Sequence, residues 1–139
     1  MRIPLAVIGI LVSVGLAPGA HAPPAAQRTR VVMLGTGVPF PDPDRFGPAT
    51  VIVVDSAAYL VDAGVGVVRR WAAAIRADSL PLRVYDLRTV FFTHLHSDHT
   101  LGYPELILTS WTVEKAPRRP LMAYGPVGLA SMTEHILTA

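Results

Sequence analysis

The chain has 139 residues, of which 51% are apolar and 16% are charged, and it contains no cysteine. This composition suits one small folded domain and excludes a disordered charged tail and disulfide bonds. The formal net charge is only +2, and the basic residues form no run longer than the pairs Arg69-Arg70 and Arg118-Arg119. The sequence therefore argues against nucleic acid as a partner, although RNA as a substrate is not excluded.

The first 22 residues differ from the rest of the chain. They combine a positive start, an apolar stretch and the small-x-small pattern Ala20-His21-Ala22. These features predict a signal peptide over residues 1–22, cleaved after Ala22, and a periplasmic or secreted product. The apolar stretch is shorter than the roughly 20 residues of a spanning helix, so we expect no stable membrane anchor. Residues 23–29 are expected to form a flexible lead into a domain over residues 30–139.

The first half of this domain is predicted to begin with strands. A strand over 30–34 ends at the turn Gly35-Thr36-Gly37, and four prolines between residues 39 and 48 predict a loop. Two apolar runs, 50–55 and 58–62, predict a tight β-hairpin that turns at Ser56-Ala57. Apolar residues at positions 65, 68, 71, 72 and 75 have helical spacing, which predicts a helix within 65–77.

The second half alternates strands and helices. Residues 89–93 (TVFFT) predict a strand that is buried on both faces. The later part of 101–111 is expected to be helical, 121–124 to form a strand, and 127–138 to form a closing helix. This alternation predicts an α/β fold with layered helices and sheet.

A cluster of potential metal ligands follows the predicted strand 89–93 directly. It reads His94-x-His96-x-Asp98-His99, with three imidazoles and one carboxylate within six residues. Such nitrogen and oxygen donors suit Zn²⁺, and Mn²⁺ or Fe would also accept them. A solvated histidine loop and a pH-responsive histidine cluster are the alternatives. The density of donors directly after a buried strand favours a metal site.

The cluster resembles the HxHxDH signature of the metallo-β-lactamase superfamily. The closest resemblance is to its ribonuclease Z-like branch, which also includes arylsulfatases of the same fold. Further stretches are similar to that branch; they are Leu34-Gly35-Thr36-Gly37-x-Pro39, Pro43-Asp44-Arg45-x-Gly47-Pro48-Ala49-Thr50, Leu60-Val61-Asp62-Ala63-Gly64, Gly102-Tyr103-Pro104-Glu105-Leu106 and Tyr124-Gly125-Pro126. The resemblance implies the αββα sandwich of this superfamily, of which the chain would supply about the first half, as one mixed β-sheet with flanking helices.

The resemblance also implies a role for each residue of the cluster. His94 and His96 would bind a first zinc ion, and Asp98 and His99 a second. Asp98 would also act in catalysis by orienting or deprotonating the attacking water. Asp62 would be a carboxylate that orients the motif loop, unless it caps the helix that starts near Gly64. Gly35, Thr36 and Gly37 would be a phosphate cradle or a plain turn.

Three ligands of the family's site have no counterpart in this sequence. They are one further histidine for the first metal, one further histidine for the second, and an aspartate that bridges both. His135 is expected to be an ordinary helix residue, and no aspartate follows Asp98. We therefore expect a truncated record or a gene fragment, which alone would bind metal weakly and hydrolyse little or nothing. Homodimerisation could bury an open sheet face, but it would not supply the bridging aspartate.

Two functions follow as hypotheses. The first is a metal-dependent hydrolase, with two zinc ions in the intact protein, that acts on a phosphodiester or a sulfate ester. Within it, the predicted export favours an arylsulfatase-like enzyme with a small-molecule ester substrate over ribonuclease Z. The second is a non-catalytic zinc-binding fragment or an inactive gene product. A β-lactamase proper fits less well, because the flanking stretches are similar to the other branch.

Overall fold

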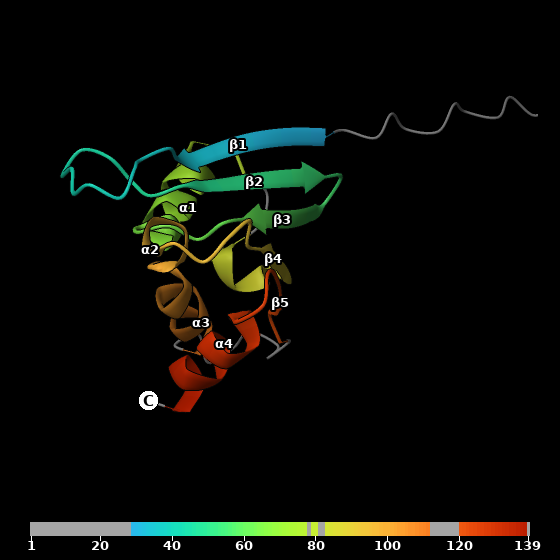
Figure 1. Cartoon of the computed structure of the whole chain (residues 1–139). Helices are drawn as coiled ribbons and strands as arrows, with labels where there is room; N and C mark the ends of the chain where they lie inside the picture. The colour runs from blue at the N-terminus through green and yellow to red at the C-terminus, as the bar shows by residue number, and fades with distance from the viewer. Residues whose placement is uncertain (1–28, 78, 81–82, 112–119, 139) are drawn as a thin grey trace, which may run out of the picture.

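A computed structural model describes residues 29–77, 79–80, 83–111 and 120–138 (Figure 1). The predicted signal peptide, and the predicted lead except for its last residue, lie outside the described residues. Thr29, which was expected to end the lead, already belongs to the first strand. Within the described ranges, no helix combines the length and the apolar character that crossing a membrane would require.

Five strands form one mixed sheet in sequential order. Their bounds are Thr29–Gly35 (β1), Ala49–Val54 (β2), Ala57–Val61 (β3), Thr89–Phe91 (β4) and Met122–Tyr124 (β5). The pairs β1/β2 and β2/β3 are antiparallel, whereas β3/β4 and β4/β5 are parallel. The prediction of one mixed sheet with flanking helices is therefore confirmed.

The hairpin turns one residue earlier than the sequence predicts. Val54 pairs with Ala57, so the turn consists of Asp55 and Ser56 rather than of Ser56 and Ala57. Asp55 takes a left-handed backbone conformation with φ of 54°. Aspartate tolerates this conformation better than most residues, which allows a tight two-residue connection at this point.

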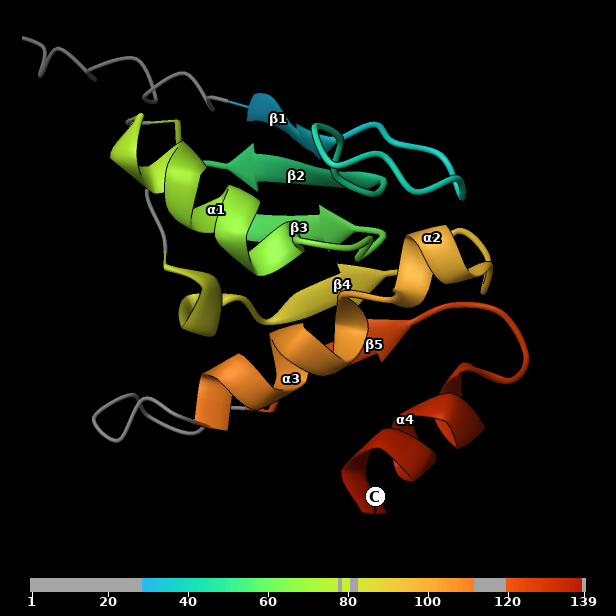
Figure 2. The same cartoon turned by 90° about the vertical axis from the view of Figure 1, so that its left-hand side faces the viewer.

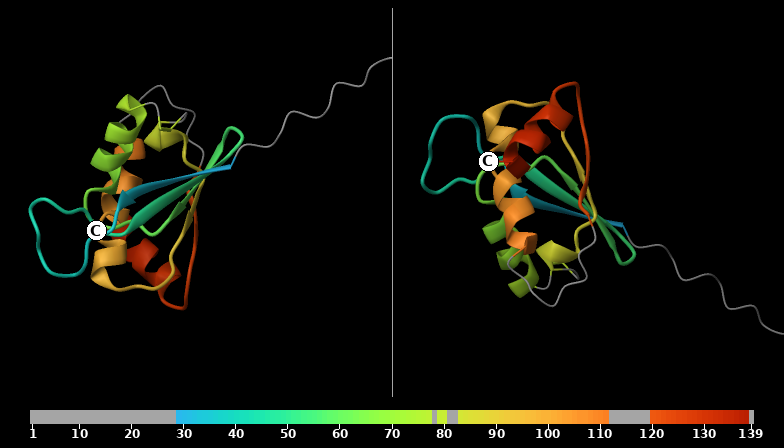
Figure 3. Two further views of the ribbon diagram at one scale, coloured as in Figure 1. Left: turned by 90° about the horizontal axis from the view of Figure 1, so that it is seen from above. Right: turned by 90° about the horizontal axis from the view of Figure 1, so that it is seen from below.

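The helices all cover the same face of the sheet (Figures 2 and 3). They are α1 (Val67–Arg76), the one-turn α2 (Ser97–Thr100), α3 (Tyr103–Trp111) and α4 (Leu129–Thr138), with a short 3₁₀ helix, η1 (Val84–Asp86), before β4. The core lies between this helical layer and the sheet. Trp71 of α1, Leu60 of β3 and Val90 of β4 are fully buried in it. In α1 the buried positions are Val67 and Trp71, whereas Val65, which was counted in the predicted helical pattern, is exposed.

The opposite face of the sheet carries apolar side chains that no described element covers. The strand register aligns them in two rows that also contain Thr50 and the buried Thr89; the rows are Val31-Ile52-Tyr59-Thr89-Met122 and Met33-Thr50-Val61-Phe91-Tyr124. Val31 is 63% exposed and Tyr124 is 50% exposed. The prediction that residues 89–93 are buried on both faces is therefore wrong, since Phe91 of β4 is 40% exposed. Successive side chains of a strand point to opposite faces, and helices cover only one of them here.

Candidate metal centre

The histidine cluster lies at the end of β4, where the chain leaves the sheet and forms the single turn α2. Two backbone hydrogen bonds tie this segment to the end of β3: Asp62 N–H donates to the Phe91 carbonyl (2.8 Å), and Ala63 N–H donates to the His99 carbonyl (2.8 Å). Within the turn, the hydroxyl of Thr100 donates to the carbonyl of His96. The carboxyl ends of the parallel strands β3 and β4 therefore bring Asp62 and the cluster together.

His94 and His96 form the first pair of donors. Nε2 of His94 lies 3.1 Å from Nδ1 of His96, and the ring centroids are 4.6 Å apart. Two nitrogens that bind one tetrahedral zinc at its usual bond length are about 3.3 Å apart. The spacing of these two nitrogens is thus close to the spacing that a shared metal ion would impose.

Asp98 and His99, both in α2, form the second pair. Nε2 of His99 lies 3.5 Å from Oδ2 of Asp98, and the ring of His99 is 4.0 Å from that of His94 between centroids. The other carboxylate oxygen of Asp98, Oδ1, is buried and has no hydrogen-bond partner among the described residues. A buried carboxylate oxygen without a partner is costly, and a metal ligand position would account for it.

Asp62 supports the cluster from behind. Its Oδ1 accepts a hydrogen bond from the backbone N–H of Thr93 (2.8 Å), and its Oδ2 accepts one from the Thr93 hydroxyl (2.9 Å). Oδ2 also lies 2.8 Å from Nδ1 of His99, although without the alignment of a hydrogen bond. Asp62 is only 6% exposed. It does not cap the next helix, because α1 begins after Gly66 and has no side-chain cap.

Two glycines that the sequence did not single out for a structural role let the segments around the cluster approach one another. A Cβ on Gly47 would lie 2.8 Å from the carbonyl oxygen of Asp98, and one on Gly64 would lie 2.5 Å from the same oxygen. Gly64 N–H also donates to the carbonyl of Pro48. A single sequence marks these positions only as glycines in loops. The need for close backbone approach becomes visible only when three segments meet in space.

The predicted turn residues Gly35, Thr36 and Gly37 lie beside this junction. A Cβ on Gly35 would lie 2.2 Å from the Gly47 carbonyl oxygen, and Gly37 N–H donates to the Phe46 carbonyl (2.7 Å). Backbone packing thus accounts for glycine at positions 35 and 37 without a ligand, whereas Thr36 is exposed. A role in holding phosphate stays a prediction for this turn.

The four potential ligands of the cluster are arranged as two pairs, and neither pair makes a complete metal site by itself. Among the described residues, no three His, Asp or Glu side chains are arranged so that they could hold one ion. His135, as expected from its helical pattern, lies in α4, where its ring Nδ1 contacts the carbonyl of Ser131 (2.7 Å). The described chain therefore supplies part of a metal centre. His94 and His96 form one pair of potential ligands, and Asp98 and His99 form another.

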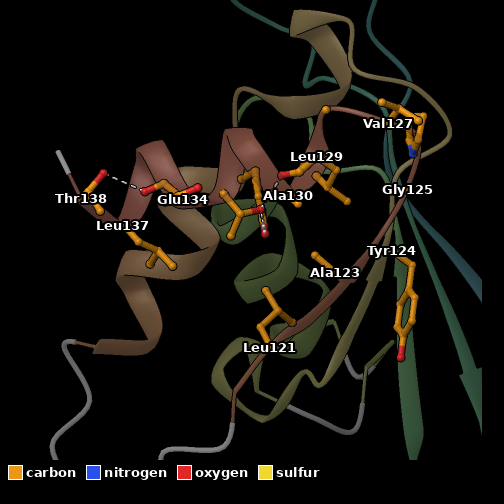
Figure 4. Close-up of a pocket in the computed structure, with 14 residues that line it drawn as sticks. Leu121, Ala123, Tyr124, Gly125, Val127, Leu129, Ala130, Glu134, Leu137 and Thr138 are labelled. Atoms are coloured by element: carbon orange, nitrogen blue, oxygen red, sulfur yellow. Dashed lines mark hydrogen bonds between the residues drawn. The ribbon is translucent and has the colours of Figure 1, made fainter.

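A large groove of the described residues lies elsewhere. It has a volume of about 980 Å³ between β5, the turn after it and α4, and its lining includes no residue of the histidine cluster. Leu121, Leu129 and Leu137 point into it (Figure 4). The chemistry of the donors, rather than the size of the groove, identifies the candidate site.

Comparison with known families and proteins identifies what the chain is similar to. A model of the metallo-beta-lactamase superfamily matches residues 42–137. A ribonuclease Z of Mycobacterium bovis (strain BCG / Pasteur 1173P2) is 42% identical over 110 residues, which are 78% of this chain and 37% of that protein. A ribonuclease Z of Mycobacterium marinum is 40% identical over the same share of each chain. The chain thus spans about 37% of the length of the curated relatives it matches.

Solved structures show the same fold. Human tRNase Z, short form, superposes with a TM-score of 0.66 at 30% identity, over 80% of this chain and 39% of that one. The metallo-beta-lactamase fold protein YhfI from Bacillus subtilis superposes with a TM-score of 0.63 at 18% identity, over 78% of this chain and 41% of that one. Together with the family match, these likenesses confirm the expectation of the N-terminal part of this fold, and they imply a metal at its site.

The comparisons overturn the predicted preference for an exported, arylsulfatase-like enzyme. The similar curated proteins are ribonucleases Z at 37% to 42% identity. The preference rested on the predicted signal peptide, which lies outside the described residues. The expectation of a small-molecule ester substrate without nucleic acid is wrong for a related reason. Net charge sums over the whole chain, whereas contact with a phosphate backbone needs only a few well-placed cations.

Proposed function

Because the chain belongs to the metallo-beta-lactamase superfamily, we propose that it is part of a metal-dependent hydrolase that cleaves phosphodiester bonds in RNA, as the name ribonuclease Z implies for its relatives. One observation carries the proposal. The match at 42% identity covers 78% of the chain, and a stretch of that length necessarily contains the central residues that build the histidine cluster. The likeness to ribonuclease Z therefore includes the stretch that carries the proposed metal centre.

The residues of the cluster have separate tasks in this proposal. His94 and His96 offer two imidazole nitrogens to one metal ion, and Asp98 and His99 offer a carboxylate and an imidazole to a second, with zinc favoured by this donor set. When bound, the metal supplies Lewis-acid activation of water and of the phosphate group. In this proposal Asp98 would also orient the attacking water and accept its proton.

Asp62 and Thr93 have a positioning task. The carboxylate of Asp62 contacts both the backbone and the hydroxyl of Thr93, and it faces Nδ1 of His99. An imidazole that contacts a carboxylate through one nitrogen presents the other nitrogen in a defined direction. Asp62 therefore orients His99 and holds the start of the motif loop.

The second candidate function is metal binding without turnover. It is favoured by the arrangement of the donors in pairs, with no group of three among the residues described. In that case the chain of 139 residues would bind zinc weakly and would not cleave RNA on its own.

A direct test measures zinc binding and hydrolysis by the 139-residue chain. We expect zinc to bind, and any turnover to be on an RNA oligonucleotide and not on an aryl sulfate. His96→Ala should weaken zinc binding and remove turnover, as should a chelator, whereas His135→Ala, outside the cluster, should change neither. Zinc binding without RNA cleavage would favour the second candidate. Turnover of the aryl sulfate, or full activity of His96→Ala, would contradict the proposal.

A further inference from the structure

The Gly35-Thr36-Gly37 turn also forms a wall of a second, smaller pocket, which the metal centre does not use. This pocket has a volume of about 370 Å³, near the lower end of the range of about 300–1,000 Å³ for ligand sites. Its other walls come from Arg45 and Phe46 in the loop before β2 and from Arg70 in α1. None of its lining residues belongs to the histidine cluster.

Arg70 is held in a defined orientation in this pocket. Its Nε donates to the carbonyl of Leu34 (3.0 Å), and its guanidinium carbon lies 5.1 Å from the centre of the Phe46 ring. These two contacts orient the guanidinium plane. Its two terminal amino groups make no hydrogen bond or ion pair with the described part of the chain. A planar guanidinium with both terminal groups available matches two oxygens of a phosphate.

Arg45 adds a second cation beside it. Its Nε lies 3.4 Å from Oδ2 of Asp42, and its side chain is 67% exposed, so this ion pair holds it weakly. The carboxylate of Asp44 also lines the pocket and partly opposes the charge of the two arginines. The pocket therefore carries a net positive charge, with one cation fixed and one free to adjust.

The pocket and the metal centre share one loop. Phe46 stacks with Arg70, and the next residue, Gly47, is packed against the backbone of Asp98. The loop that lines the pocket therefore also packs against the backbone of the metal motif, which is why we assign the pocket to the same substrate.

We propose that this pocket binds a backbone phosphate of the RNA substrate, with Arg70 as the fixed donor and Arg45 as the adjustable one. The inference rests on the proposed function, because it assigns the pocket to the same substrate. It adds two residues that bind substrate outside the metal centre. It also gives the Gly35-Thr36-Gly37 turn a place at the wall of a phosphate site.

The test measures how tightly the full 139-residue chain binds a labelled oligouridylate at several salt concentrations. Arg70→Gln and Arg45→Gln should each weaken binding by roughly tenfold, as expected for the loss of one charge-assisted contact. Each should also lower the slope of log affinity against log salt by about 0.7, the value for one phosphate on a single strand. Asp44→Asn should tighten binding. The matched control is Arg69→Gln, which removes the same charge from the neighbouring, exposed position of α1.

Equal weakening by Arg69→Gln and Arg70→Gln would show attraction to overall charge and would overturn the proposal, as would unchanged binding in Arg70→Gln and Arg45→Gln. Arg45 is exposed, so its variant keeps the test valid if Arg70→Gln fails to fold. Inorganic phosphate alone is the second probe. If it shifts the Arg70 Nε–H resonance while RNA does not, the RNA assignment is overturned.

Failure of the pocket and failure of the proposed function give different results. RNA cleavage with normal affinity in both arginine variants would remove the pocket and leave the function standing. RNA binding that depends on Arg70 and Arg45, together with turnover of the aryl sulfate and not of RNA, would support the pocket and contradict the proposed function.

Discussion

Asp62 shows how a single carboxylate can link two strands to a metal motif. It ends β3 with a left-handed backbone conformation, φ of 60°, which is uncommon for a residue with a side chain. This conformation lets its backbone N–H reach the Phe91 carbonyl while its carboxylate reaches Thr93 and faces His99. The local backbone strain is offset by this set of contacts, which makes the residue sensitive to substitution.

Asp62→Asn tests the orienting role. The amide oxygen can still accept from Thr93 N–H, so we expect the free energy of unfolding to change by about 1 kcal/mol or less. The negative charge facing His99 is lost, and zinc affinity should fall by about 10- to 100-fold, as for other groups that orient metal ligands. Competition with a chromophoric chelator measures the affinity. Asp86→Asn, in η1 at the other end of β4, is the control and should bind zinc normally. Unchanged affinity in Asp62→Asn would contradict the role.

Gly64 is the residue where backbone packing leaves no room for a side chain. A Cβ would lie 2.4 Å from the Gly47 carbonyl carbon and 2.5 Å from the Asp98 carbonyl oxygen, and both are backbone atoms that cannot rotate away. Gly64→Ala should therefore lower the free energy of unfolding by about 1–3 kcal/mol or more. It should also displace the turn that carries Asp98 and weaken zinc binding.

Gly125→Ala is the control for that prediction. Its Cβ would lie 2.9 Å from the end of the Leu129 side chain and 3.0 Å from Cβ of Phe92, and the nearest backbone atom, the Phe92 carbonyl oxygen, is 3.3 Å away. Urea unfolding of the two variants compares the cost of a severe clash with backbone atoms with the cost of a milder approach to side chains. A smaller loss of stability in Gly64→Ala than in Gly125→Ala would rule out the close approach described for Gly47 and Gly64.

At the scale of the elements, α1 is positioned by one large side chain. Trp71 is fully buried between the helix and the sheet, whereas the next two residues, Ala72 and Ala73, are exposed. The helix begins at a left-handed Gly66 without a side-chain cap, so packing rather than capping holds it. The same helix carries Arg70, which ties it to the end of β1.

Trp71→Ala should cost about 3–5 kcal/mol, the usual effect of removing a large aromatic side chain from a core. That loss is a large part of the roughly 5–15 kcal/mol that stabilises a domain, so the variant is expected to be mostly unfolded at moderate temperature. Trp71→Phe keeps much of the volume and should show a smaller, measurable loss by thermal unfolding. Ala72→Ser, on the exposed side, should stay within about 0.5 kcal/mol of the original chain. Equal stability of all three variants would mean that α1 does not pack as described.

At the scale of the whole molecule, the sheet has helices on one face (Figure 3), whereas its other face carries exposed apolar side chains. Exposed apolar surface of this extent drives association in water. We therefore expect the isolated chain to self-associate as its concentration rises. Val31→Thr and Tyr124→Thr keep residues that favour strands and remove apolar area from this face, so they should reduce the association.

Sedimentation velocity over a range of concentrations measures this effect. The control is Val127→Thr, which removes the same type of side chain from a fully exposed position in the turn after β5. It should leave the association unchanged. If Val127→Thr reduces association as much as the two sheet variants do, the exposed face is not its cause.

Much of this arrangement could be predicted from the sequence, because its causes are local. The apolar runs separated by glycine and proline set the order of strands and helices, and the spacing of His94, His96, Asp98 and His99 identified the metal motif and the superfamily. The errors are also local ones. The hairpin turn was predicted one residue too late, because the sequence does not show whether Ala57 lies in the turn or pairs in the following strand. A short apolar run such as 89–93 does not reveal whether one face of the strand or both faces are covered.

Other features were decided only by tertiary structure, since they depend on segments that are distant in sequence. The contacts of Asp62 with Thr93, the packing of Gly47 and Gly64 against Asp98, and the position of Arg70 over Phe46 all join separate elements. Composition gives the net charge of +2 but not where the charged residues lie. It therefore could not show that Arg45 and Arg70 line one pocket. The sequence by itself determined the chemistry of the donors and the fold that carries them. The tertiary structure decided which of them face one another, because only the folded chain brings distant backbones within hydrogen-bonding distance.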